Sequence, residues 1–106
     1  MVIPGLIEMH CHILPGVDDG SKDTETSVKM LRRLALQGAE TVVLTPHYYS
    51  DSISLADFIA RRNAAFVNLQ AALPPDAPRL LLGAEVYVSR YLMNNADLTP
   101  ICITGT

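Results

Sequence analysis

Apolar runs suited to β-strands alternate with amphipathic helical segments along this chain. The strand-like runs are Leu6–Ile13, "ETVVLTP" before His47, and "RLLLGAEVYV", which is either one strand or a strand interrupted at Gly83. Helical spacing of apolar residues covers the segments 24–38 and 55–73. Because helices that link successive strands lead to parallel pairing, this order predicts an α/β fold with a mostly parallel sheet, or part of an α/β barrel.

Capping and breaking residues mark where these elements end. Asp23 or Thr24 can cap the first helix, Gly38 is an expected stop after it, and Pro46 ends the second strand. The predicted apolar faces of the two helices are Val28, Leu31, Leu34 and Ala35, and Phe58, Ile59, Phe66, Leu69 and Leu73. Toward the end of the chain we expect a helical or turn segment around 90–94 and a β-like run in "PICITGT".

The composition favours a globular protein of the cytoplasm. With 106 residues, 49% hydrophobic, the chain can form one small domain with a modest core. A formal net charge of -3, without a basic cluster, argues against a nucleic-acid partner. We find neither an apolar run of about 18 residues nor the features of a signal peptide, so we expect no membrane insertion. The two cysteines, Cys11 and Cys102, are too few for a disulfide framework, and we expect both to pack in the interior.

Ionisable side chains concentrate where the predicted strands end. In an extended strand Glu8, His10 and His12 share one face, while Met9, Cys11 and Ile13 lie on the other. The other members of this set are Asp18 and Asp19 in the loop that follows, His47 directly after the second strand, and Glu85 at the end of the third apolar run. Parallel strands end on one rim, where imidazole and carboxylate groups together can bind Mn²⁺, Fe, Zn²⁺ or Mg²⁺.

Each of these residues also has an ordinary structural explanation. A His-x-His pair arises by chance, a histidine such as His47 is commonly a hydrogen-bonded structural residue, and Asp19 before Gly20 is a typical turn residue. Glu85 can be a solvated carboxylate at a strand edge. The coincidence favours a metal site, since all three histidines of the chain fall at predicted strand ends.

The segments "HCHILPGVDDGSKD", "TPHYYSD" and "GAEVYV", in this order, resemble the polymerase and histidinol phosphatase (PHP) superfamily of metal-dependent phosphoesterases. The resemblance is to its bacterial capsule-associated tyrosine-protein phosphatase branch. It implies a distorted (β/α)₇ barrel with two to three metals, often Mn²⁺ or Fe. It also implies that metal-activated hydroxide attacks the phosphotyrosine of a bacterial tyrosine kinase that governs capsule or exopolysaccharide synthesis.

The resemblance also assigns roles to individual residues. His10, His12, Asp19, His47 and Glu85 match the family's metal ligands. Asp18, next to the matched aspartate, and Glu8, two residues before the first histidine, are expected to support the ligands rather than bind metal. The family usually has aspartate at the position of Glu8.

The family pattern further implies that residues 1–106 are a single, incomplete domain. In the family, the C-terminal half supplies another histidine, an Asp-x-His pair and an arginine that contacts phosphate. We therefore expect the isolated chain to be inactive or impaired, although the intact enzyme is a metal-dependent protein-tyrosine phosphatase.

Two alternatives to this function remain. The chain can belong to a related metallohydrolase of small phosphomonoesters such as histidinol phosphate, or be an inactive fragment with a partial metal site that self-associates to cover exposed apolar edges. A cysteine-dependent phosphatase needs an arginine six residues after its nucleophile, but Val17 stands there relative to Cys11. The cysteine mechanism is therefore excluded for Cys11.

Overall fold

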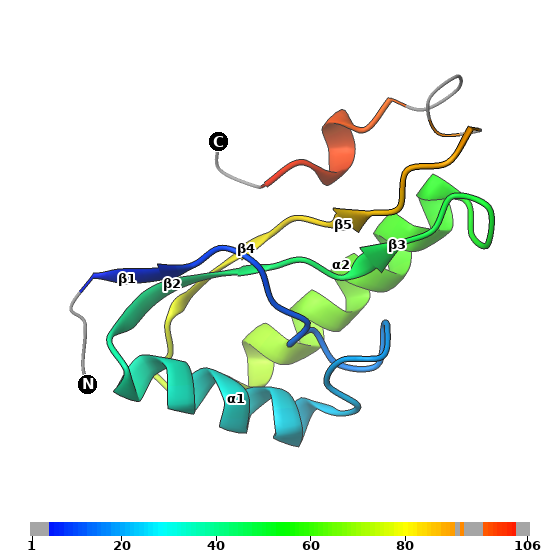
Figure 1. Ribbon diagram of the computed structural model, residues 1–106. Helices are drawn as coiled ribbons and strands as arrows, with labels where there is room; N and C mark the ends of the chain where they lie inside the picture. Colours follow the sequence, from blue (N-terminus) through cyan, green and yellow to red (C-terminus); the bar gives the residue numbers. More distant parts are fainter. Residues whose placement is uncertain (1–4, 91, 93–96, 104–106) are drawn as a thin grey trace.

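A computed structural model describes residues 5–90, 92 and 97–103 of this chain (Figure 1). Its elements are β1 (Leu6–Glu8), α1 (Thr24–Leu36), β2 (Ala39–Leu44), β3 (His47–Tyr48), α2 (Leu55–Ala72), β4 (Arg79–Leu82), β5 (Glu85–Val86) and the 3₁₀ helix η1 (Thr99–Ile101). A three-stranded sheet has the order β1-β2-β4, β3 pairs with β5, and all of these pairs are parallel. The predicted α/β class with parallel strands is confirmed.

Strands β3 and β5 prolong β2 and β4 beyond a short interruption. The backbone N–H of Gly83 donates to the carbonyl of Leu44 at 2.8 Å, and that of Glu85 donates to Pro46 at 2.9 Å, so the two chain segments stay paired between the sheets. The sequence left open whether "RLLLGAEVYV" is one strand or a strand interrupted at Gly83, and the structure has the interrupted form, with β4 ending at Leu82 and β5 beginning at Glu85. In the resulting register His47 lies opposite Glu85.

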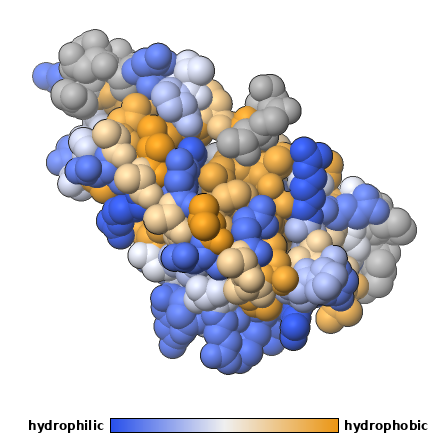
Figure 2. All heavy atoms as spheres, turned by 180° about the vertical axis from the view of Figure 1, so that it is seen from behind, coloured by the Kyte–Doolittle hydropathy of each residue, from blue (hydrophilic) through white to orange (hydrophobic). Residues whose placement is uncertain are grey.

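Both helices pack on one face of the three-stranded sheet, as Figure 1 shows. Leu31 of α1 and Leu69 of α2 are buried in the same cluster as the strand residues, as their predicted places on the helix faces require. The buried members of this cluster are Ile13, Leu14, Leu31, Ala39, Val42, Leu44, Leu69, Leu80 and Leu82. In Figure 2 hydrophilic side chains gather over α1 at the lower edge, and apolar ones are exposed in the middle of that face. Among the described residues, no helix combines the length and the apolar character needed to cross a bilayer.

The helix ends follow the capping signals in the sequence. Asp23, rather than Thr24, caps α1, and its Oδ1 accepts the backbone N–H of Thr26 at 2.8 Å. Gly38 follows the helix with a φ of 104°, a conformation that glycine adopts without the steric cost of a Cβ atom. Ser54 caps α2 by accepting the N–H of Asp57 at 3.1 Å.

The first strand is shorter than predicted and ends at Glu8 instead of Ile13. The N–H of His10 donates to the Glu8 side chain (Oε1, 3.1 Å) and not to a neighbouring strand, which ends the ladder. Beyond it, Cys11 still contacts the extension of β2, since its carbonyl accepts the N–H of Thr45 at 3.0 Å. Cys11 and Ile13 pack against the core as predicted, but Met9 is exposed.

The end of the chain also differs from the prediction. "PICITGT" was expected to be β-like, but Thr99–Ile101 forms η1, with Pro100 in its first turn, where the missing N–H of proline costs nothing. Cys102 is exposed and not buried, because the alternation of a strand does not apply here. Residues 104–106 lie outside the described residues. In the predicted helical or turn segment 90–94, Arg90 and Leu92 are helical, and residues 91, 93 and 94 are not described.

A buried arginine links helix α2 to two segments near the end of the chain. Arg62 is 3% exposed, and its guanidinium donates to the carbonyls of Gly83 (3.0 Å) and Pro100 (3.3 Å). Its Cζ also lies 5.9 Å from the centre of the Phe58 ring. Burial lowers the pKa of Arg62. The side chain thus ties α2 to the interruption between β4 and β5 and to η1.

We expect Arg62→Met to lower the free energy of unfolding by about 2 kcal/mol, because the buried carbonyl of Gly83 and the carbonyl of Pro100 lose a charged donor while the apolar stem is retained. Urea denaturation followed by circular dichroism measures the change. Arg61→Met is the matched control, because Arg61 is exposed and should change stability by less than about 0.5 kcal/mol. Equal stability of the two variants would contradict this role of Arg62.

Candidate metal centre

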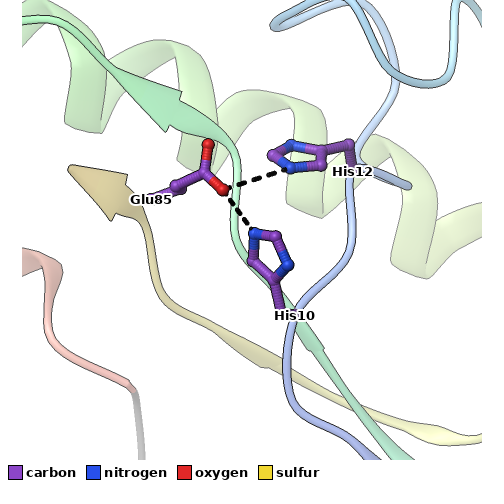
Figure 3. A group of neighbouring side chains, drawn as sticks. All are labelled: His10, His12 and Glu85. Atoms are coloured by element: carbon purple, nitrogen blue, oxygen red, sulfur yellow. Dashed lines mark hydrogen bonds and ion pairs between the residues drawn. The ribbon is translucent and has the colours of Figure 1, made fainter. Parts of the chain in front are cut away.

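The ionisable residues predicted from the sequence meet at the carboxyl ends of the parallel strands. His10 and His12 follow β1, His47 begins β3 after β2, and Glu85 begins β5 after β4. Figure 3 shows the rings of His10 and His12 pointing toward the Glu85 carboxylate. Parallel pairing brings these residues together because the ends of parallel strands lie at one edge.

The carboxylate of Glu85 lies at the centre of the three histidines. Its Oε1 is 2.6 Å from His10 Nε2 and 3.8 Å from His12 Nε2, and its Oε2 pairs with His47 Nδ1. Desolvation raises the pKa of Glu85, but the hydrogen bond with His10 and the charges of the histidines outweigh it and hold this pKa below its usual value. Glu85 is therefore an ionised carboxylate at neutral pH.

Asp18 orients the second histidine and the loop around it. Its Oδ2 is 3.0 Å from His12 Nδ1 and accepts the N–H of His47 at 3.0 Å, while Oδ1 accepts the N–H of Gly20 at 2.9 Å. Desolvation raises the pKa of Asp18, but these hydrogen bonds lower it further, so the net shift is downward. Because an ionised carboxylate only accepts, His12 Nδ1 carries the proton and Nε2 stays available toward Glu85.

The two neighbouring aspartates differ strongly in exposure. The Asp18 side chain is 6% exposed, whereas that of Asp19 is 86% exposed, with Oδ1 3.6 Å from His47 Nε2. Asp18 was expected to be a supporting residue, and its hydrogen bonds with His12 and His47 are of that kind. Asp19, the expected ligand, lies at the rim next to His47.

Two groups of potential metal ligands share His12. One comprises His10, His12 and Glu85, and the other His12, Asp18 and His47; within each, one ligand atom per residue lies within 4.8 Å of the others. Imidazole nitrogens with carboxylate oxygens suit Mn²⁺, Fe and Zn²⁺. The donor set therefore fits the metal that the sequence predicts, and the binding roles of the individual residues stay predictions.

Glu8 contacts the candidate centre through the backbone of His10. Its Oε1 accepts the N–H of His10 at 3.1 Å. The carboxylate thus reaches His10 although glutamate is one methylene longer than aspartate. This contact agrees with a supporting role.

Several residues shape the 14–22 loop although the sequence alone did not identify them. A Cβ on Gly20 would lie 2.2 Å from the carbonyl oxygen of His12, a distance that no side chain tolerates. The carbonyl of His12 also accepts the N–H of Ser21 at 2.9 Å. Buried Ser27 of α1 donates to the carbonyl of Ile13, and its Oγ lies 2.7 Å from that of Ser21. No sequence pattern marks these serines, since their partners are backbone atoms brought together by folding.

Cys11 lies near the centre but is unsuited to nucleophilic chemistry. Desolvation by burial raises its pKa to about 11, and its Sγ donates to the carbonyl of Val43 at 3.3 Å. A thiol with this pKa is protonated at neutral pH. The structure therefore agrees with the packing role expected for Cys11.

Aromatic rings extend from the centre toward the solvent. His12 stacks on His47 with ring centres 4.4 Å apart, His47 stacks on Tyr49 at 5.5 Å, and Tyr49 leans on Tyr87 at 5.7 Å. A pocket of about 480 Å³ opens beside these rings, and His47 and Tyr49 line it together with both aspartates of the loop. The centre is thus open to a ligand from this side.

Comparisons with known proteins connect the chain to a phosphatase family. The family described as "Capsular polysaccharide synthesis, CpsB/CapC" matches residues 6–104. The tyrosine-protein phosphatase YwqE of Bacillus subtilis is 34% identical over 84 residues, which are 78% of this chain and 33% of that protein. The tyrosine-protein phosphatase CpsB of Streptococcus agalactiae is 27% identical over 96 residues, 91% of this chain and 40% of that protein.

A solved structure shares the fold as well. It comes from work on YwqE from Bacillus subtilis and CpsB from Streptococcus pneumoniae, described as unique metal-dependent tyrosine phosphatases. The match has a TM-score of 0.56 and 26% identity, and it covers 83% of this chain and 36% of the other. The chain thus spans well under half the length of these relatives.

Proposed function

Because this chain belongs to the CpsB/CapC family of capsular polysaccharide synthesis, we propose that it carries part of the active centre of a metal-dependent protein-tyrosine phosphatase. The proposed substrate is a phosphotyrosine protein, a bacterial tyrosine kinase of capsule or exopolysaccharide synthesis. The observation that carries the proposal is the convergence of His10, His12 and His47 on the Glu85 carboxylate. The names of the relatives, tyrosine-protein phosphatases, support the substrate class.

The proposed ligands are His10, His12, Asp19, His47 and Glu85. Asp19 is included because its Oδ1 lies 3.6 Å from His47 Nε2, at the exposed side from which a metal and substrate can enter. Mn²⁺ is the metal we propose, with Fe, Zn²⁺ or Mg²⁺ as alternatives, and two to three ions in the intact domain. Asp18 and Glu8 position the ligands through the contacts described above.

In the proposed reaction, a bound metal supplies Lewis-acid catalysis by lowering the pKa of a water molecule and neutralising negative charge on the phosphoryl group. The chain's own residues prepare the site for it. Asp18 holds the proton of His12 on Nδ1, which directs the Nε2 lone pair into the centre. Its other hydrogen bonds, to Gly20 and His47, hold the loop against β3 and keep these groups in place before substrate arrives.

We also propose that residues 1–106 are the N-terminal part of a PHP-type distorted (β/α)₇ barrel. Two features support this: both helices cover the same face of the parallel sheet, and the candidate ligands lie at the carboxyl ends of the strands, where barrels carry their active sites. The free cysteines, Cys11 and Cys102, are consistent with a reducing compartment, and we propose a cytoplasmic location. Self-association of the chain stays a prediction.

Metal removal tests the proposed function in the protein encoded by the whole reading frame. We expect it to hydrolyse a phosphotyrosine peptide, to lose this activity with a chelator such as EDTA, and to regain it with Mn²⁺, because the reaction needs the metal. Phosphate release is the measurement. Histidinol phosphate is the comparison substrate, and a preference for it would favour the small-molecule phosphatase instead. Full activity that survives both chelation and His10→Ala would refute the metal mechanism.

A further inference from the structure

The pocket beside the candidate metal centre has walls of different chemical character. Of its lining residues, Asp19 and His47 belong to the centre, Tyr49, Ile53 and Phe58 form an apolar wall, and Arg61 adds a positive charge. Its volume of about 480 Å³ leaves room for more than a phosphoryl group. A ligand held at the centre would therefore place its next chemical group against the apolar wall.

Tyr49 belongs to this wall but is not part of the hydrophobic core. Its neighbour Tyr48 is 3% exposed and packs with Phe58 in a buried cluster, whereas Tyr49 is 43% exposed. The ring of Tyr49 is nonetheless fixed, because it stacks on His47 at 5.5 Å and 21° and leans on Tyr87 at 5.7 Å and 45°. An exposed aromatic ring held in position at a pocket wall can pack against an aromatic ring of a ligand.

From this geometry we infer that Tyr49 is a specificity-determining residue, which selects aryl over alkyl phosphate esters by packing against the ring that carries the phosphate. The inference rests on the proposed function, because it requires the phosphoryl group to lie at the His47 end of the pocket. The exposed part of the Tyr49 ring then contacts the substrate ring, and Arg61 offsets the negative charge of an anionic ligand. An alkyl phosphate fills the phosphoryl position but leaves the aromatic wall unused.

Two phosphonates that cannot be hydrolysed at the P–C bond test the inference by binding alone. The dissociation constants of phenylphosphonate and methylphosphonate are measured by isothermal titration calorimetry with the protein encoded by the whole reading frame, in the presence of Mn²⁺. We expect the wild type to bind phenylphosphonate about tenfold more tightly, an effect of the size that aromatic packing and burial provide. Tyr49→Phe should keep this ratio, because it retains the ring.

Tyr49→Ala should reduce the ratio to about twofold. Val67→Ala is the control, since Val67 is exposed on α2 and does not line the pocket, and it should keep the wild-type ratio. An unchanged ratio in Tyr49→Ala, an equal loss in Val67→Ala, or no binding of either phosphonate to the wild type would each overturn the inference.

The proposed function fails separately from this inference. If the protein shows the Tyr49-dependent preference for phenylphosphonate but no metal-dependent hydrolysis of phosphotyrosine, the binding pocket stands and the phosphatase function is wrong. If hydrolysis is present but the preference does not depend on Tyr49, the phosphatase function stands and the role of Tyr49 is wrong.

Discussion

Glu85→Gln is expected to weaken Mn²⁺ binding by about 100-fold or more and to remove the proposed phosphatase activity of the intact protein. The substitution keeps the shape of the side chain but removes its negative charge. In the structure this one carboxylate contacts His10, His12 and His47. An amide offers a single acceptor oxygen and turns its NH₂ group toward one of the histidines. The three histidines therefore lose the carboxylate that contacts all of them.

Mn²⁺ titration in competition with a chromophoric chelator measures the affinity. Glu25→Gln is the matched control, because Glu25 lies exposed on α1, where it pairs with Lys29 at 3.4 Å. This control makes the same chemical change away from the centre and should leave the affinity at the wild-type value. A Glu85→Gln variant that binds Mn²⁺ within about threefold of the wild type would show that the histidines do not depend on this carboxylate.

The second large effect is expected for Gly20→Ala, which should lower the free energy of unfolding by about 3 kcal/mol and disturb the metal centre. The added Cβ would lie 2.2 Å from the carbonyl oxygen of His12 and 2.4 Å from its Cβ. Since both chain segments meet here through backbone, the clash cannot be relieved by turning a flexible side chain. Either His12 or the loop must move, and the 2.9 Å hydrogen bond from Ser21 to His12 breaks.

Gly16→Ala separates this clash from the general cost of replacing a glycine. Gly16 lies in the same loop and has a φ of 70°, but the nearest atom to its added Cβ is 3.9 Å away. We expect it to lose about 1 kcal/mol from backbone strain and to keep Mn²⁺ affinity. Urea denaturation and Mn²⁺ titration of both variants provide the comparison. Equal losses of stability and unchanged Mn²⁺ affinity in both variants would contradict the proposed clash with His12.

The elements whose signals are local in sequence were predicted well. Apolar residues at helical spacing, with Asp23 before the first helix and Gly38 after it, predicted α1 because capping and periodicity depend on near neighbours. The sequence left open whether a break falls at Gly83, and the structure has one there. The strand end at Glu8 was not, because it depends on a side chain that takes the N–H of His10. The same applies to η1, whose tertiary contact with Arg62 overrides the apolar pattern of "PICIT".

For the candidate metal centre, the order of strands and helices along the chain already predicts which residues gather. Strand–helix alternation requires parallel strands, and their carboxyl ends share one edge, so His10, His12, His47 and Glu85 had to be near one another. The two aspartates could not be separated in this way. Whether Asp18 or Asp19 turns inward depends on the path of the 14–22 loop.

The path of the 14–22 loop follows from contacts that form only when the chain folds. Gly20 allows the loop to lie directly on the backbone of His12, and Ser27 ties the loop's start to α1 through the carbonyl of Ile13. These contacts join residues that are distant along the chain and leave no periodic trace in the sequence. The same reason applies to Tyr48 and Tyr49, which both follow the second predicted strand. Only the packing against Phe58 buries Tyr48, while the stack on His47 holds Tyr49 at the pocket.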